Sequence, residues 1–310
     1  MHRYRFLISI ILLTFSVACT SSTRHAETVR SSPRVDRPLN HGAALYLQGC
    51  YTRALEFFQE AHERYTVLDN LPGIASSLNS MANVYYQLDD MQGALRSYTE
   101  ALAVYRQLED RDGAVRVLSN QAAALVRSGQ LEEAAHTLDQ ADALAGAAPL
   151  LLTLRLKNRA LIAMARNETA EAQRLLTQAL AVRRAGDDAS KAAAHYALGR
   201  LLVETGRPAE AEPHLQEALT FDRAGGAYPS VAKDLAALGV CYARLGDHAR
   251  AVGFFLRSAK IYALLQDTLR TQELIASLKD SADRAGVDIQ ASLHWIEEWL
   301  EGRTEGTLCR

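Results

Sequence analysis

The sequence predicts an all-α protein built from a stack of helix pairs, and three observations support this prediction. Alanine and leucine, two of the strongest helix formers, dominate the middle of the 310-residue chain, which contains only 7 prolines. A pattern of small and large residues recurs six times at a nearly constant spacing. A residue that favours chain reversal recurs at the same point of each repeat. Internal repeats of this kind indicate supersecondary units that stack on one another.

In each repeat a small residue is followed four positions later by Leu, Phe or Tyr, and three positions after that by Ala or Ser. The leading small residues lie 40, 40, 38, 39 and 40 residues apart: Ala54, Ala94, Ala134, Ala172, Ala211 and Ala251. A second small residue stands twelve positions upstream of each: Gly42, Ala82, Ala122, Ala160, Gly199 and Gly239. Residues four apart share one face of a helix, so the small residues let two helices approach while the large residue fills the space beside them.

A turn-forming residue precedes each leading alanine by five positions. The six turn formers are Gly49, Asp89, Gly129, Asn167, Gly206 and Gly246. Gly, Asn and Asp tolerate the left-handed backbone conformation that ends many helices. Each repeat is therefore predicted to be two antiparallel helices, and neighbouring repeats must stack because one pair cannot bury its own apolar face.

The second repeat carries the clearest family signature. Its residues Leu78-x2-Met81-Ala82-x2-Tyr85, followed by Ala94-x3-Tyr98-x2-Ala101, resemble a tetratricopeptide repeat. The sixth repeat has a similar series that begins at Leu235. The resemblance covers residues 38–264 and implies a right-handed α-solenoid of about six helix pairs.

The period is longer than the family's usual repeat of about 34 residues and resembles that of the kinesin-light-chain subgroup. Each unit must therefore carry either an extra helical turn or a longer loop. The segments 70–73 and 225–229, which contain Pro and Gly, are predicted to be loops of this kind.

Residues 265–310 are predicted to cap the array. A helix near residues 267–285, a break at Gly286 and a final helix near 288–301 are expected. In the final helix Leu293 and Ile296 share an apolar face. A solenoid needs an end helix with a polar outer face, although a helix that docks on a partner would have the same pattern.

The N-terminus has the features of an export signal. A basic start precedes the apolar run 6–17, which is too short to span a bilayer because that needs about 20 residues. The end of this run and Cys19 resemble a bacterial lipoprotein signal, although Ser16 stands where Leu is usual. The resemblance implies a signal peptide over residues 1–18 and lipidation of Cys19. A signal without a lipid, or an uncleaved anchor, is the alternative.

The residues that follow, 19–37, are rich in Ser, Thr, Arg and Pro and are predicted to be a flexible tether. Thr20 and Ser21 imply sorting to the outer membrane if the enterobacterial rule holds. We therefore expect an outer-membrane lipoprotein of the bacterial cell envelope that faces the periplasm.

The remaining cysteines match no zinc spacing. Cys50 and Cys241 fall in the first and last repeats, which a linear stack of helix pairs would place tens of ångströms apart. A disulfide needs Cα atoms within about 7 Å. Both are therefore expected to be small packing residues, and Cys309 is left without an expected partner.

The resemblance also implies a concave groove lined by the first helix of each pair. Transfer of the family's groove positions gives Asn79, Asn83, Gln87, Arg116, Asn120, Arg127, Lys157, Asn158, Arg200, Lys233 and Arg244, with Tyr46 and Tyr86 near the rim. Asn can hold the backbone of an extended peptide, and Arg and Lys attract carboxylates. The set suits an acidic peptide or a free C-terminus, although each residue alone could be an ordinary solvated side chain.

No phosphate-binding loop, His-Glu-x-x-His motif or Gly-x-Ser-x-Gly motif is present in the chain. The net charge of −2 gives no global attraction to nucleic acid. We therefore expect no cofactor, no metal and no catalysis, but a lipid-anchored scaffold that binds a protein or peptide. A self-assembling structural protein, which would associate through the array ends or the helix that contains Trp295 and Trp299, is the second hypothesis. A cell-wall enzyme is the third.

Overall fold

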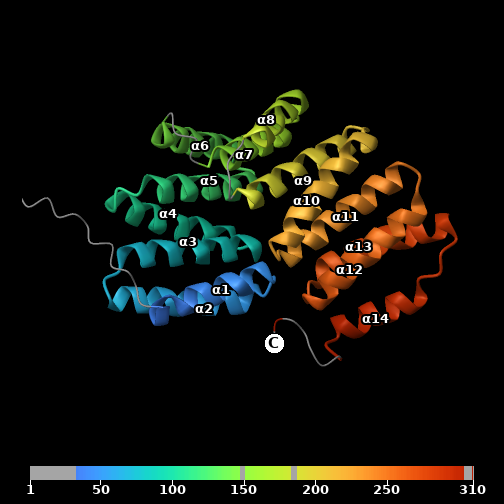
Figure 1. Ribbon diagram of the computed structural model, residues 1–310, viewed down its shortest axis with the longest axis horizontal. Helices are drawn as coiled ribbons and strands as arrows, with labels where there is room; N and C mark the ends of the chain where they lie inside the picture. The colour runs from blue at the N-terminus through green and yellow to red at the C-terminus, as the bar shows by residue number, and fades with distance from the viewer. Residues whose placement is uncertain (1–32, 147–150, 183–186, 304–308, 310) are drawn as a thin grey trace, which may run out of the picture. The chain divides into compact units, whose positions relative to one another are not determined.

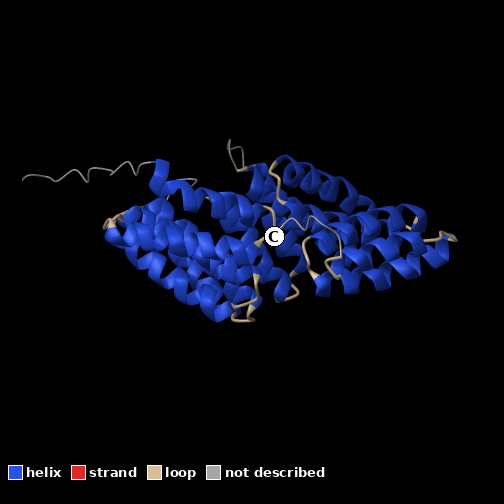
Figure 2. Cartoon of the chain, turned by 90° about the horizontal axis from the view of Figure 1, so that it is seen from below, coloured by secondary structure: helices blue, strands red, loops and turns tan. Residues whose placement is uncertain are grey.

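The computed structural model describes residues 33–146, 151–182, 187–303 and 309, all within one compact unit of residues 32–310. Fourteen α-helices and no strand occur in these residues (Figures 1 and 2). The helices are α1 (Pro33–Leu47), α2 (Tyr51–Val67), α3 (Leu71–Gln87), α4 (Met91–Gln107), α5 (Arg111–Arg127), α6 (Leu131–Ala145), α7 (Leu152–Ala165), α8 (Thr169–Ala181), α9 (Asp188–Glu204), α10 (Pro208–Ala224), α11 (Tyr228–Arg244), α12 (His248–Leu264), α13 (Thr268–Ala285) and α14 (Gln290–Leu300). The predicted all-α array of helix pairs is confirmed.

The turn inside each of the first six pairs is made as the sequence predicts. All six turn formers have a positive φ, from 61° at Asn167 to 84° at Gly49. In all six pairs the next helix begins two residues later. In the second pair Asp90 caps α4, because its carboxylate accepts a hydrogen bond from the backbone N–H of Gly93 at 2.8 Å.

The extra length of each repeat lies in the helices. Most helices of the array have 17 residues, and the turns between them are short. The predicted loop 70–73 is wrong, because Asn70 caps α3 and the next three residues form its first turn. The predicted loop 225–229 is wrong in part, because α11 starts at Tyr228 with Pro229 in its first turn. Proline fits there because first-turn N–H groups have no partner within the helix.

The predicted close crossings are present within the pairs. A Cβ built on Gly42 would lie 2.7 Å from Phe58 Cε1, and one on Gly239 would lie 2.6 Å from Phe255 Cδ1. These contacts are too short for a real carbon atom, so the second helix of each pair touches the backbone of the first. The leading alanines of the second helices are fully buried at the same crossings.

The odd-numbered helices form the inner layer of the array. Each helix from α1 to α12 packs on the next in the chain, α14 packs on α12, and the odd-numbered helices also contact one another in order from α1 to α11. In a curved two-layer stack, the helices of the inner layer lie closer together. The first helix of each pair therefore lines the inner face.

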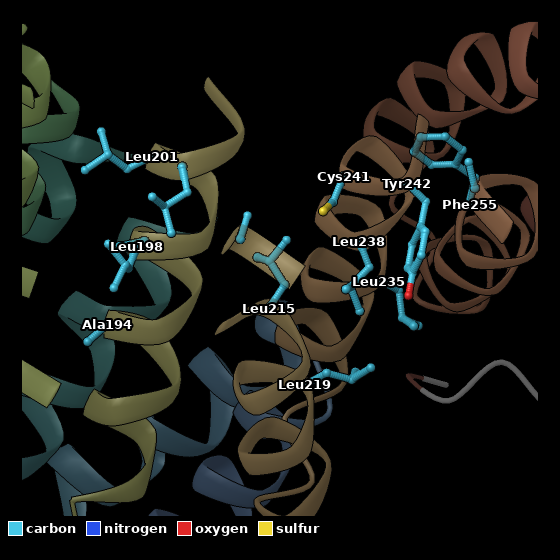
Figure 3. Packing of buried hydrophobic residues seen from close by; sticks show 14 of the residues in the cluster. Ala194, Leu198, Leu201, Leu215, Leu219, Leu235, Leu238, Cys241, Tyr242 and Phe255 are labelled. Carbon is cyan, nitrogen blue, oxygen red and sulfur yellow. The ribbon is translucent and has the colours of Figure 1, made fainter. Parts of the chain in front are cut away.

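The core follows this layering. One continuous apolar cluster runs from Ala160 in α7 to Leu293 in α14. Figure 3 shows its centre, where Leu198 of α9, Leu215 of α10 and Leu238 of α11 follow one another across three helices. Each layer of side chains thus serves two neighbouring pairs, as expected for a stacked array.

Helices α13 and α14 follow the sixth pair at the end of the array, and both pack on α12. Gly286 ends α13 in the left-handed conformation, with φ at 64°. Ile296 of α14 is fully buried against α12, and Leu293 is 8% exposed. Trp295, on the other face of α14, is 54% exposed.

The structure differs from the sequence prediction at both ends. Helix α1 begins at Pro33, inside the segment predicted to be a tether up to residue 37. The predicted signal peptide, Cys19 and the rest of the tether lie outside the described residues.

Cys50 is not a free packing residue, and Cys309 is not unpaired. The two form a disulfide with a Cα–Cα distance of 5.0 Å across 259 residues of sequence. The prediction assumed a linear stack that keeps the chain ends apart, whereas the curved array brings them together. Cys241 is free and buried, as predicted.

The close crossing in the sixth pair makes a testable prediction. Gly239→Ala should lower the free energy of unfolding by about 1–3 kcal/mol, because the new methyl group must displace the ring of Phe255. Gly253, in the second helix of the same pair, has no atom within 4 Å of a built Cβ and provides a control. Gly253→Ala should raise the free energy of unfolding by about 0.5–1 kcal/mol. Chemical denaturation of both variants measures these changes, and equal effects would contradict the assignment of the crossing.

Candidate binding groove

The first helix pair lies against the last pairs. A Cβ built on Gly49, in the α1–α2 turn, would lie 2.7 Å from Pro229 Cγ of α11 and 3.3 Å from Leu265 Cδ1, just after α12. The Cys50–Cys309 disulfide joins the same turn to the C-terminal segment. A cavity of about 520 Å³ lies at this contact, between residues 49–53 and 265–270.

Three asparagines on α3 and α5 bind one another in the first half of the inner face. Asn120 Nδ2 donates to Asn79 Oδ1 and to Asn83 Oδ1, each at 3.3 Å. The Tyr98 hydroxyl donates to Asn83 Oδ1 at 2.7 Å. Asn83 Nδ2 and Asn120 Oδ1 have no partner among the described residues. The network therefore holds these amides in place and leaves a donor and an acceptor for a peptide backbone.

Two other predicted groove residues in this half join neighbouring repeats. Gln87 Nε2 donates to the Tyr46 hydroxyl at 3.1 Å, which links α3 to α1. Arg127 donates to the Tyr86 carbonyl oxygen at 3.0 Å and pairs with Asp89 at 2.9 Å. The charge of Arg127 is therefore already compensated. Its main contact is with the end of α3, not with open space.

The structure separates the remaining predicted residues into three environments. Asn158 is fully buried, donates to the Ser119 carbonyl oxygen at 2.6 Å and so joins α7 to α5 below the groove surface. Arg116 is exposed near the start of α5. Arg244 is exposed and lines a separate depression against α13. The predicted residues that are left belong to the second half of the groove: Lys157, Arg200 and Lys233.

Arg200 and Lys233 meet over the ring of Tyr196. Lys233 Nζ lies 4.2 Å from the ring centroid and Arg200 Cζ lies 5.9 Å from it. Arg200 is paired with Glu204 at 2.5 Å. Burial lowers the pKa of Lys233, while Asp234 and Asp222 act in the opposite direction.

Lys157 of α7 belongs to the same cluster. Burial, and then repulsion from Lys233, lowers the pKa of Lys157 to about 8. Lys233 thus affects the pKa of Lys157, although their helices are two repeats apart.

Two carboxyl groups complete this cluster and were not predicted from the sequence. Asp234 is fully buried, and neither of its carboxyl oxygens accepts a hydrogen bond from a described residue. Burial, and then repulsion from Asp222, raises the pKa of Asp234 to about 8. Burial also raises the pKa of Asp222. Tyr196, Tyr262 and Arg270 were missed as well.

A repeat position could have indicated Tyr196 in advance. Lys157 and Tyr196 each stand three residues before the small crossing residue of their helix, and so does the predicted Asn79. That spacing places the three side chains on the same face of successive inner helices. Asp222 has no comparable signal, because it lies on an even-numbered helix.

His195 of α9 lies against His214 of α10. Its Nδ1 atom is 3.1 Å from His214 Nδ1, and burial lowers the pKa of both side chains. In the described part of the chain, no group of three or more His, Cys, Asp or Glu residues could hold a metal ion. No helix there is both long and apolar enough to span a membrane.

Comparison with known families identifies the array. The tetratricopeptide repeat model matches residues 35–107, 73–145 and 150–224, which together make up more than half of the chain. The chain belongs to the tetratricopeptide repeat family. No curated protein sequence matches this tetratricopeptide repeat chain.

Three solved structures share the fold of this tetratricopeptide array. The Rap conjugation gene regulator of plasmid pLS20, in complex with the Phr* peptide, has a TM-score of 0.59 at 16% identity, and the match covers 93% of this chain and 82% of the regulator. A Rap protein complexed with Competence and Sporulation Factor has a TM-score of 0.58 at 16% identity, with 81% and 76% covered. Aspartyl phosphate phosphatase F from Bacillus subtilis has a TM-score of 0.56 at 18% identity, with 86% and 70% covered. At these identities the likeness shows the fold alone.

The disulfide makes a prediction about the closed contact. Cys309→Ala should lower the free energy of unfolding by up to about 5 kcal/mol, because the disulfide closes a loop of 259 residues. Thermal unfolding with and without a reducing agent measures this effect. The reducing agent should destabilise the wild-type protein and leave the variant unchanged, and an equal response of both proteins would contradict the assigned bond.

Proposed function

We propose that this chain is a lipid-anchored scaffold of a bacterial cell envelope, whose tetratricopeptide array binds an extended segment of a partner protein in its inner groove. The main support for the proposal comes from the side chains of the inner face. It combines asparagine amides that keep unused hydrogen-bonding atoms with Lys157, an ammonium group that has no ion-pair partner among the described residues.

The shared fold adds support by analogy. Two chains of similar fold have structures with the Phr* peptide and with Competence and Sporulation Factor. A fold does not by itself transfer a function, so a peptide ligand is part of the proposal for this chain. The amides and cations of its own groove are the reason to extend the analogy.

The location of the protein rests on the N-terminal sequence and on the disulfide. Disulfides persist mainly in oxidising compartments, such as the periplasm and the cell exterior. The Cys50–Cys309 bond therefore supports export. The basic start, the apolar run 6–17 and Cys19 support a lipid anchor in the envelope.

The groove is tested with the partner recovered from the native host by mild cross-linking, affinity purification and mass spectrometry. The double variant Asn83→Ala with Asn120→Ala should bind that partner about 10- to 30-fold more weakly, because it loses about two hydrogen bonds. The control variant changes two exposed amides on even-numbered helices, Gln59→Ala with Gln216→Ala, and should bind like the wild type. Equal affinity of both variants for the partner would contradict the groove assignment. Recovery of the chain alone would favour self-assembly.

The anchor is tested separately by cell fractionation. Cys19→Ala should move the protein from the membrane fraction to the soluble periplasmic fraction, because the modified side chain is lost. Cys241→Ala, which changes a buried free cysteine, should leave the protein in the membrane fraction. Retention of the Cys19→Ala protein in the membrane would contradict a lipid anchor on this residue.

A further inference from the structure

The contact between the first and the last helix pairs contains little of the apolar core. The apolar cluster of the first pair consists of residues from α1 to α3, and among the described residues Cys309 is its one member from the C-terminal part of the chain. The apolar clusters of α11 to α14 consist of other residues. A cavity of about 520 Å³ lies between the two sides. The two sides are therefore not held together by a shared, closely packed core.

The polar side chains that line this cavity bond within their own side of the contact. Gln87 donates a hydrogen bond to a tyrosine of α1, and Arg270 pairs with Asp267 at the start of α13. Across the contact, the turn at Gly49 lies against the ring of Pro229. The disulfide is the covalent link between the same turn and the C-terminal segment. It is the strongest connection across this contact.

The array itself does not need this contact in order to fold. In a stack of helix pairs, each pair is stabilised by its direct neighbours, and this packing runs without a break from α1 to α13. Arg303 and Cys309 are six positions apart, so they can be separated by at most about 20 Å. The disulfide therefore keeps the α1–α2 turn within that reach of the end of α14. When the bond is broken, no covalent link limits the distance between the two sides.

The two sulfur atoms of the bond differ in their access to other molecules. Cys50 is only 3% exposed, whereas Cys309 is partly exposed. Disulfides that other thiols can reach are the ones that take part in exchange. Cys241 does not compete, because it is fully buried. Burial, and then the charge of Glu212, raises the pKa of Cys241 to about 11, so its sulfur stays protonated.

We propose that the Cys50–Cys309 disulfide is a redox switch: a dithiol protein of the Cys-x-x-Cys class opens it by exchange at Cys309, and the first helix pair then separates from the last pairs. Opening takes apart the cavity between the two sides and changes the curvature of the inner face. The inference does not depend on which partner binds in the groove.

The exchange consists of two thiolate attacks. A thiolate of the dithiol protein attacks Sγ of Cys309, the bond between the two sulfur atoms breaks, and Sγ of Cys50 leaves with the electron pair and takes up a proton. The second thiolate of the dithiol protein then attacks the mixed disulfide and releases Cys309, which also takes up a proton. Two electrons and two protons pass to this chain, and the dithiol protein keeps a disulfide. The reverse sequence closes the switch.

Energy transfer between two dyes in the full-length protein tests the opening. The dyes are attached to non-natural amino acids at the positions of Glu56 in α2 and Glu273 in α13, which are both exposed, so that the native cysteines remain. Dithiothreitol, added below the unfolding temperature of the reduced protein, should lower the transfer and leave the helical circular-dichroism signal in place. A control pair at Glu56 and Glu100, both in the first half of the array, should not respond.

The double variant Cys50→Ser with Cys309→Ser should give the lower transfer without a reducing agent and should not respond to one. Unchanged transfer between positions 56 and 273 after reduction would overturn the proposal, because the contact would then persist without the bond. Loss of the helical signal in both the reduced protein and the double variant would also overturn it, because the bond would then be needed for the fold and not only for the closed form.

The site of exchange is tested with a thioredoxin variant that has Cys-x-x-Ser in place of Cys-x-x-Cys. This probe lacks the second thiol, so the mixed disulfide accumulates and its position can be mapped by mass spectrometry. The probe should be attached to Cys309, with Cys50 as a free thiol, and Cys241→Ala should react like the wild type. Attachment at Cys50, or no adduct at all, would contradict exchange at Cys309.

Discussion

The close crossing of the two helices in each pair is the constraint on which the rest of the structure depends. A glycine or alanine in the first helix lets the large residue of the second helix reach its backbone, as Phe255 does at Gly239. The same crossing is repeated along the array, with the inner helices packed on one another. The inner layer is shorter than the outer layer, so the array curves and the α1–α2 turn meets the start of α11 and the end of α12.

The local features of the fold could be predicted from the sequence because they depend on short-range rules. Helix pairs, their crossing points and their left-handed turns follow from residues at most about twelve positions apart, and the positive φ values at Asp89 and Asn167 confirm the turns. The extra residues of each repeat were harder to place. Pro72 and Pro229 indicated loops, yet proline is equally suited to the first turn of a helix, and the structure uses it there.

The long-range features could not be predicted in the same way. The position of the first pair relative to the last depends on the sum of the small rotations between successive repeats. No short segment of the sequence encodes this sum. The disulfide between Cys50 and Cys309 was missed for this reason. The groove residues show the same difference between short-range and long-range features. Repeat positions identified Lys157 and Lys233 individually, but their mutual repulsion and the acids beside them depend on how α7, α10 and α11 come together. The same positions also selected Asn158, whose side chain is buried between helices.

The central claim is that the partner binds in the inner groove. A photo-cross-linking amino acid placed at residue 240, which lines an apolar cavity of the groove, tests this most directly in the native host. Residue 67, at the end of α2, is 86% exposed and serves as the comparison position. Binding in the inner groove predicts a cross-linked partner from residue 240 and no such product from residue 67. Cross-linking of the same partner from residue 67 but not from residue 240 would contradict it.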